Sequence, residues 1–184
     1  AEQGIKTYVV GGLVRDVLLG RNTADIDLAI AADALEVAPR VAAALGGKYV
    51  LLDKVNRVGR VVLFDKETSS NNVPWKLDFS TFEGDIEQDL VRRDFTINAL
   101  AIELNQFLEH PYTPPRSTAK KRCATPPQLR GLIDHFNGHD DLRRGVIRAV
   151  TETALESDTT RLLRAVRLAA ELGFTIEKKT ETLI

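Results

Sequence analysis

The spacing of apolar residues predicts short alternating strands and helices over the first part of the chain. An apolar run at 6–10 predicts a buried strand, and apolar residues three and four positions apart at 13–19 predict a helix. Alternation at 25–30 predicts a strand whose even-numbered residues face the core. An alanine-rich stretch at 34–45 predicts a second helix, which the glycines after it end.

The rest of the chain predicts three more strands and a long amphipathic helix. The strands are expected at 48–53, 57–64 and 75–80, followed by a helical segment at 86–93. A helix is expected from about 154 to 172, where apolar residues recur at helical spacing before a glycine.

Other segments are less regular. Residues 98–103 fit either a continued helix or a strand, because a short apolar run has no clear period. Residues 66–74 are polar and turn-forming, and 131–148 predict short elements around two glycines. Residues 107–129 are rich in Pro, Thr and Lys, which predicts an irregular insertion.

The sequence also shows where positive charge is concentrated. The 184 residues have a formal net charge of -1, so overall charge does not indicate a nucleic-acid partner. Basic residues nevertheless cluster at 92–93, 116–122, 143–148 and 161–167. Each cluster is either part of a basic face for a phosphate-rich partner or ordinary solvated surface.

The single cysteine, Cys123, excludes an intramolecular disulfide and is typical of a reducing compartment. No apolar run approaches the length of a membrane span, and the first residues do not have the pattern of a signal peptide. We therefore expect a cytoplasmic protein with no membrane partner. The sequence does not indicate the oligomeric state.

Asp25 and Asp27 are the first candidates for chemistry. Side chains two apart on a strand share a face, so these carboxylates repel each other unless a cation compensates them. Such a pair can hold Mg²⁺ ions that bind a triphosphate and an attacking hydroxyl. Asp78, between apolar neighbours on a predicted strand, is the candidate for a third carboxylate. The alternative for all three is a turn or surface acid.

Gly11 and Gly12 stand between the first predicted strand and helix. Glycine there lets the backbone approach a phosphate, with helix-terminal amides as donors. An ordinary tight turn is the alternative. Arg15, one helical turn on, can reach a phosphate or form a salt bridge with Asp16 or Asp25. Asp16 can also hold the loop by accepting its amides.

The segment RRDFTINALAI at 92–102 combines polar and apolar residues densely. If it is helical after Asp94, then Asp94 and Asn98 face the same way and can hydrogen-bond a ribose and a base. Asp94 as a simple helix cap is the alternative. Arg92 and Arg93 either contact phosphate or only balance charge.

Arginines form a stripe on the helix expected at 154–172. Asp158 and Arg161 are three apart and share a face, and Arg164 and Arg167 continue the stripe. Asp158 accepts and Arg161 donates hydrogen bonds, so the pair presents complementary groups to the edge of a base. The alternative is a surface ion pair worth roughly 0.2–0.5 kcal/mol.

Together these segments resemble the family of class II tRNA nucleotidyltransferases and bacterial poly(A) polymerases. Five segments carry the resemblance, in the family order: GGLVRDVLLGR, ADIDLAI, LVRRDFTINALAIEL, LIDHFNGHDDLRRGVIRAV and DTTRLLRAVRLAAELGFTIE. The resemblance implies an α+β, polymerase-β-like nucleotidyltransferase fold, with a mixed, largely antiparallel sheet and flanking helices. It implies a head domain over 1–150 and the start of a helical neck over 151–184.

The resemblance also implies a metal-dependent reaction that adds CMP or AMP, from CTP or ATP, to the 3′ end of tRNA. Asp25 and Asp27 match the family's metal-binding carboxylates, so one or two Mg²⁺ ions are expected. The other matches are the triphosphate-proximal Gly11, Gly12, Arg15 and Asp16, the ribose and phosphate segment with Arg93, Asp94 and Asn98, and the base-reading Asp158 and Arg161, with Arg164 on the same helix.

Three departures from the family pattern bear on this reaction. Ser157 stands where the family usually has Glu before the base-reading Asp. The stretch 79–94 passes directly from the third carboxylate to Arg-Arg-Asp, whereas many CCA-adding members have a longer flexible loop there. This shortness resembles members that add only the two cytidines. The sequence also ends within the expected neck, before the family's body and tail domains.

We therefore expect CC addition in preference to full CCA addition, with A addition and poly(A) synthesis as alternatives. The opposing class is a non-catalytic module that binds nucleotide or RNA. Asp25 and Asp27 argue against it, because a binding module does not need the pair. A small-molecule nucleotidyltransferase on the same fold would explain the carboxylates but not the arginines at 158–167.

Overall fold

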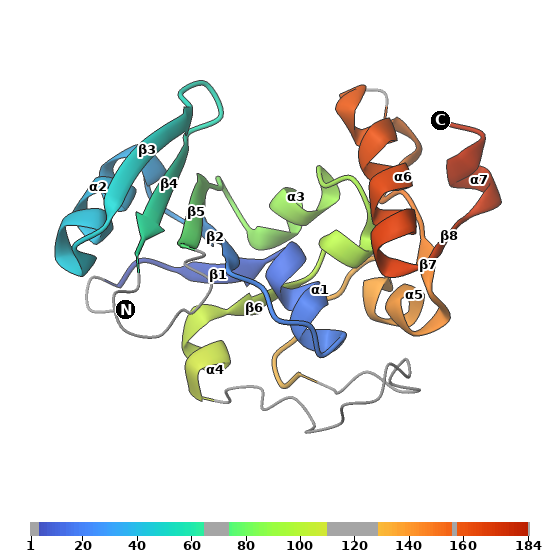
Figure 1. The fold of residues 1–184 in the computed structure, drawn as a ribbon, viewed down its shortest axis with the longest axis horizontal. Helices are drawn as coiled ribbons and strands as arrows, with labels where there is room; N and C mark the ends of the chain where they lie inside the picture. Colours follow the sequence, from blue (N-terminus) through green and yellow to red (C-terminus); the bar gives the residue numbers. More distant parts are fainter. Residues whose placement is uncertain (1–3, 65–73, 110–128, 156–157, 184) are drawn as a thin grey trace.

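The computed structural model describes residues 4–64, 74–109, 129–155 and 158–183 and contains a six-stranded sheet with helices packed against it (Figure 1). The strands of this sheet are β1 (Thr7–Val10), β2 (Asp25–Ile30), β3 (Lys48–Asp53), β4 (Val58–Leu63), β5 (Trp75–Thr81) and β6 (Ala101–Glu103). The helices are α1 (Gly12–Leu18), α2 (Ala34–Leu45), α3 (Ile86–Val91), α4 (Leu104–Glu109), α5 (Gly138–Arg144), α6 (Thr160–Leu172) and α7 (Lys178–Glu181).

The strand order of the sheet is β3-β4-β5-β2-β1-β6, and every pairing is antiparallel except that of β2 with β5. The expected mixed, largely antiparallel sheet is therefore confirmed. The parallel pairing sets Asp27 directly opposite Asp78. Two carboxylates far apart in the sequence thus become neighbours in the sheet.

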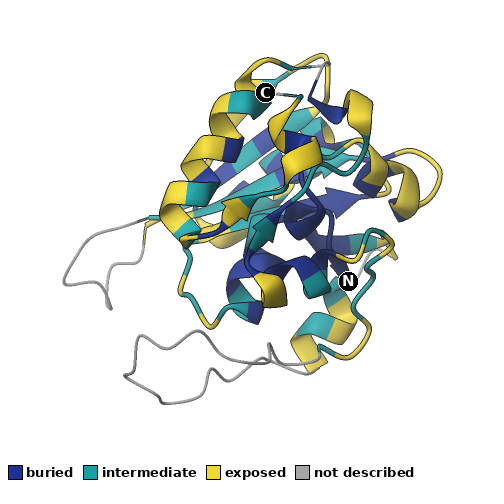
Figure 2. Ribbon diagram, turned by 90° about the vertical axis from the view of Figure 1, so that its right-hand side faces the viewer, coloured by how far each residue is buried: buried dark blue, intermediate teal, exposed yellow. Residues whose placement is uncertain are grey.

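The sheet buries apolar side chains on both faces, as the dark interior of Figure 2 shows. Val9 and Leu28 belong to the larger core, whereas Tyr8 and Val10 pack in a smaller cluster with α3. This division follows from the period of two along a strand. The even-numbered residues of β2 face the larger core, as predicted, which leaves Asp27 on the opposite face.

The C-terminal part of the described chain packs onto the same core. The short strands β7 (Val146–Ile147) and β8 (Thr175–Ile176) pair in parallel and tie the end of α6 to the segment after α5. Ala165 and Leu168 of α6 are buried in the larger core cluster. The division of the chain at residue 150 stays a prediction. None of the described helices is long and apolar enough to cross a membrane.

The predicted start of the long helix near Ala154 is wrong. Glu152–Ala154 form only a 3-10 turn, and α6 begins at Thr160. Asp158 precedes the helix, and its carboxylate accepts hydrogen bonds from the Thr160 amide and hydroxyl. This capping arrangement satisfies a free helix-terminal amide and fixes where α6 begins.

The structure describes only part of the segments that had no regular pattern in the sequence. After Asp94 the chain forms a 3-10 turn at Thr96–Asn98 and then enters β6, so the strand alternative holds for the end of 98–103. The predicted irregular insertion at 107–129 begins inside α4, and most of it lies outside the described residues, as does most of the turn at 66–74.

Candidate active site

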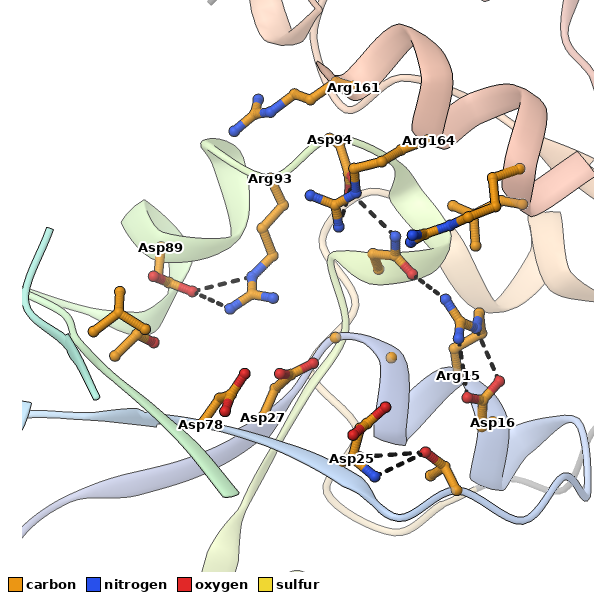
Figure 3. Close-up of a pocket in the computed structure, with 18 of the residues that line it drawn as sticks. Arg15, Asp16, Asp25, Asp27, Asp78, Asp89, Arg93, Asp94, Arg161 and Arg164 are labelled. Carbon is orange, nitrogen blue, oxygen red and sulfur yellow. Dashed lines mark hydrogen bonds and ion pairs between the residues drawn. The ribbon is translucent and has the colours of Figure 1, made fainter. Parts of the chain in front are cut away.

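A cavity of about 1140 Å³ lies between the sheet, α1, the segment after α3, and α6 (Figure 3). Its lining is mostly polar. The predicted site residues that line it are Gly11, Gly12, Arg15, Asp16, Asp25, Asp27, Asp78, Arg93, Asp94, Asn98, Arg161 and Arg164. Asp158 is the one predicted residue that does not line it. Segments spread over more than a hundred positions of sequence therefore meet at one place.

Three carboxylates stand side by side along the sheet in Figure 3: those of Asp25, Asp27 and Asp78. Asp25 lies 3.2 Å from the Lys76 ammonium. Arg60 of β4 donates two hydrogen bonds to Asp78, at 2.6 and 2.7 Å. The two outer carboxylates thus have direct cationic partners, whereas Asp27 stands between them.

Burial raises the pKa of the Asp27 carboxyl above its ordinary value. The neighbouring Asp78 and Asp25 carboxylates act in the same direction, while Arg93 and the Gly12 amide act against it. The raised pKa means that the negative charge of Asp27 is only partly compensated by the protein. A bound cation would complete that compensation.

Gly11 and Gly12 let the backbone run close beneath these charged groups. Gly11 has φ 67° and ψ −128°. A Cβ atom on Gly11 would lie 2.9 Å from Arg93 Nη1 and 3.3 Å from Asp27 Oδ2. The same atom on Gly12 would lie 3.5 Å from Arg15 Nη2. Gly11 is therefore more than part of an ordinary tight turn, because Arg93 occupies the space that its Cβ would need, whereas a Cβ on Gly12 would make only an ordinary contact.

Arg15 and Asp16 form the salt bridge that the sequence left as an alternative. Arg15 donates through Nε and Nη2 to the two oxygens of Asp16, at 3.0 and 2.9 Å, and through Nη1 to Asn98 Oδ1 at 2.8 Å. Both side chains of the bridge are about nine-tenths buried. Arg15 therefore links α1 to the 3-10 turn, and its contact with a phosphate stays a prediction.

The Asp94 carboxylate binds both the 3-10 turn that follows it and α6. Its Oδ1 accepts hydrogen bonds from the Phe95 amide at 2.8 Å and from Asn98 Nδ2 at 3.2 Å. Its Oδ2 lies 3.0 Å from Arg164 Nη2, which makes an ion pair across the cavity. A polar chain thus runs from Arg164 through Asp94 and Asn98 to Arg15.

Asp158 and Arg161, the pair expected to read the base, do not face the cavity together. Arg161 donates to two backbone carbonyls, those of Ala154 at 2.6 Å and Arg92 at 2.9 Å. Asp158 caps α6, and the hydrogen bond from the Thr160 hydroxyl is the main reason that its pKa is lowered. In the described residues no side-chain hydrogen bond joins Asp158 to Arg161. The cavity therefore contains the donor of the predicted pair but not its acceptor.

Sequence reasoning missed two residues that hold the site together. Asp89 of α3 binds both Arg92 and Arg93. Its signal was an acid three and four positions before two arginines on a predicted helix, a spacing that favours ion pairs. Arg60 was also missed, because nothing local to β4 shows that β5 pairs beside it.

The donors available for a metal ion are few. Across the described ranges there is no group of three or more His, Cys, Asp or Glu side chains arranged to hold a metal. Asp78 is bonded to Arg60 and Asp25 to Lys76, so the assignment of Asp25 and Asp27 as metal ligands stays a prediction. Their carboxylate oxygens suit Mg²⁺, which commonly takes one or two carboxylates together with water and substrate phosphates.

Comparison with known proteins gives matches over almost all of the chain. Residues 7–148 match the family model for the poly A polymerase head domain. The chain is 37% identical over 179 residues to a CC-adding tRNA nucleotidyltransferase of Synechocystis, covering 96% of this chain and 35% of that protein. It is 32% identical over 185 residues to an A-adding tRNA nucleotidyltransferase of Aquifex aeolicus, covering 98% and 20%.

A solved structure gives the same result for the fold. The Thermotoga maritima CCA-adding enzyme in complex with tRNA superposes with a TM-score of 0.70 at 38% identity, over 99% of this chain and 37% of that one. The chain thus spans between about a fifth and two fifths of the relatives that it matches. The expected polymerase-β-like fold is confirmed.

Proposed function

Because the chain belongs to the poly A polymerase head-domain family, we propose that it provides the nucleotide-binding site of an enzyme that adds nucleotides to the 3′ end of tRNA. One observation supports this most directly. Asp25 and Asp27 open into a cavity whose other side is formed by arginines of α6. Carboxylates for a cation and guanidinium groups for phosphate or base therefore share one space.

The carboxylates would hold Mg²⁺, which supplies charge neutralisation for the triphosphate and activates the attacking 3′-hydroxyl. The chain's own groups then bind and orient the nucleotide. The glycine turn brings the backbone near the phosphates, and Arg93 adds positive charge beside Asp27. Asn98 and Asp94 present an amide and a carboxylate to the ribose. These groups are held in place by their mutual hydrogen bonds.

Base selection is assigned to α6 and its cap. Arg161 and Arg164 line the cavity, and each is already bonded within the chain. Reading a base with Arg161 requires that it exchange at least one backbone carbonyl for the base edge. Asp158 would have to leave Thr160 to act as the matching acceptor. The proposed reading state therefore differs from the arrangement described above in at least two side chains.

CC addition remains the favoured variant of this activity. Its support is the short passage from β5 to α3, where only residues 82–85 separate the two elements. The relatives do not separate the variants, because CC-adding, A-adding and CCA-adding proteins match at 37%, 32% and 38% identity. A addition, full CCA addition and poly(A) synthesis are the alternatives.

The test uses the intact natural protein that contains this chain. It is given tRNAs that end before CCA, after C and after CC, each with CTP or ATP and Mg²⁺. Incorporation of two C residues and no A supports CC addition, whereas A added only after CC indicates an A-adding enzyme. Full CCA addition or long A tails identify the other variants. Nucleotide binding without any incorporation would support the non-catalytic module instead.

Replacing Asp27 with asparagine tests the proposed role of its carboxylate in holding the metal. It keeps the size of the side chain but removes the charge that would hold the metal. We expect incorporation to be lost while CD spectra and melting temperature stay close to those of the unaltered protein. Retained Mg²⁺-dependent incorporation would refute the metal assignment.

A further inference from the structure

Asp89 is a buried carboxylate that lines the cavity and takes no part in the proposed chemistry. Its side chain is only 3% exposed. It accepts four hydrogen bonds from two consecutive arginines. Oδ1 accepts from Arg92 Nε and Nη2 at 3.1 and 2.5 Å, and Oδ2 accepts from Arg93 Nε and Nη2 at 3.1 and 2.7 Å.

The two arginines differ in how exposed their side chains are and in where they point. Arg92 is 61% exposed, whereas Arg93 is 20% exposed and points into the cavity. Asp89 occupies the edge of the Arg93 guanidinium formed by Nε and Nη2, as Figure 3 shows. The remaining nitrogen, Nη1, has no hydrogen bond to any described residue and lies beside the Gly11 turn.

A guanidinium can bind through two separate edges. A free arginine side chain has many rotamers, and fixing it to bind a ligand costs conformational entropy. The hydrogen bonds with Asp89 fix the Arg93 side chain when the protein folds, so this entropy is lost before any ligand binds. They also fix the direction in which Nη1 points, toward the space between Gly11 and Asp27.

The charge of Asp89 is maintained by its partners. Burial acts to raise its pKa, but Arg93 and Arg92 outweigh this effect and hold the pKa below the ordinary range of a carboxyl. Asp89 is therefore ionised wherever the protein is folded near neutral pH. Protonation therefore does not break the hydrogen bonds from Arg92 and Arg93 to Asp89 near neutral pH.

We propose that Asp89 is a positioning residue, which orients Arg93 so that Nη1 donates to a phosphate oxygen of the incoming nucleoside triphosphate. The proposal rests on the function proposed above. Asp89 itself would not contact the nucleotide. Through Arg93 it would strengthen binding of the triphosphate rather than of the base or the ribose.

The main alternative is that Asp89 only stabilises α3 and the turn after it. A purely structural role would lower the stability of the protein but would leave the affinity for nucleotide unchanged in the folded fraction. The two roles differ in a second way. Positioning acts through Arg93, so it must disappear when Arg93 is absent.

The chain offers a matched control at Asp140 in α5. Asp140 binds Arg143 at 2.6 Å and Arg144 at 2.7 Å, with the same three- and four-residue spacing. It lies away from the cavity, and its side chain is 32% exposed. Asp140→Asn therefore removes a similar pair of contacts without touching the nucleotide site.

The experiment measures the affinity of the intact protein for CTP, ATP and cytidine by calorimetry, with the KM and kcat of incorporation. Asp89→Asn should weaken CTP and ATP binding by about 10- to 100-fold, the range known for removing groups that orient the side chains of metal ligands. Cytidine affinity should change little, and KM should rise more than kcat falls. Asp89→Glu should restore part of the affinity, and Asp140→Asn should match the unaltered protein.

The decisive comparison repeats Asp89→Asn in an Arg93→Ala background. Positioning predicts no further loss there, because the two changes act through one guanidinium. An equal loss in both backgrounds, or an unchanged CTP affinity for Asp89→Asn, would overturn the proposal while leaving the proposed function intact. Failure of the unaltered protein to bind either triphosphate would overturn the proposed function as well.

Discussion

Replacing Gly11 with alanine perturbs the backbone and the charged site at one position. With φ 67° and ψ −128°, Gly11 occupies a region that residues with a Cβ rarely adopt. Holding alanine there costs about 1–3 kcal/mol of the free energy of unfolding. The added Cβ would also stand 2.9 Å from Arg93 Nη1 and 3.3 Å from Asp27 Oδ2.

The contact with Arg93 Nη1 determines the effect on function. Asp89 holds Arg93 by its other edge, so Nη1 can shift by only a few tenths of an ångström, and the shift strains those hydrogen bonds. The same movement shifts the nitrogen proposed to meet the triphosphate. Displacements in a catalytic site can lower rates by up to about 100-fold, so we expect kcat/KM to fall by roughly 10- to 100-fold.

Gly46 supplies the control, since it also has φ 67° but lies at the end of α2 with nothing within 4 Å of a Cβ. Gly46→Ala should cost about 1 kcal/mol and leave nucleotide binding unchanged. Urea unfolding gives the stabilities, and calorimetry with CTP gives the affinities. The reasoning fails if Gly11→Ala is no less stable than Gly46→Ala and binds CTP equally well.

Three further predictions concern other contacts of the fold, the first two of them at the cavity. A double-mutant cycle of Asp94→Asn and Arg164→Ala should give a coupling of about 1 kcal/mol in urea unfolding, because Asp94 is buried and the pair joins α6 to the segment after α3. Additive effects would contradict this. Asp89→Asn should destabilise the protein most at neutral pH. Since the pKa of Asp89 is lowered on folding, its stabilisation is full above about pH 4, the ordinary carboxyl range, and is lost as pH falls through the lower folded value. Unfolding at about pH 7 and pH 3 checks this, and a difference that does not shrink at low pH would be the contrary result. Gly138→Ala should cost several kcal/mol, of the order of 3, because its Cβ would lie 2.1 Å from the Thr96 carbonyl oxygen and the backbone there must shift; a melting temperature within about 2 °C of the unaltered protein would argue against it.

Local periodicity was enough to place most of the secondary structure. The strand at β2 and the helix at α2 occur at the predicted residues. The common face of Asp25 and Asp27 follows from the strand period alone. These features depend on interactions within a few residues, which is why the sequence determined them.

The candidate residues were also predictable as a set, through the resemblance of five segments to one family. What the sequence could not supply was how each one is bonded. The Arg15–Asp16 bridge was among the alternatives that spacing left open, whereas the hydrogen bonds of Asp158 with Thr160 were not. Choosing between them requires knowing which other groups compete for the same donor or acceptor.

The tertiary structure alone decided three features of the site. It placed Asp78 beside Asp27, paired Asp78 with Arg60, and buried the Asp89 carboxylate that binds two arginines. The first two depend on which strands are neighbours in the sheet, and the last on how deeply α3 is buried. Strand order and burial arise from the packing of the whole chain, whereas periodicity reports only on a residue's near neighbours. The sequence therefore predicted which residues carry the chemistry, and the fold decided how their charges are shared.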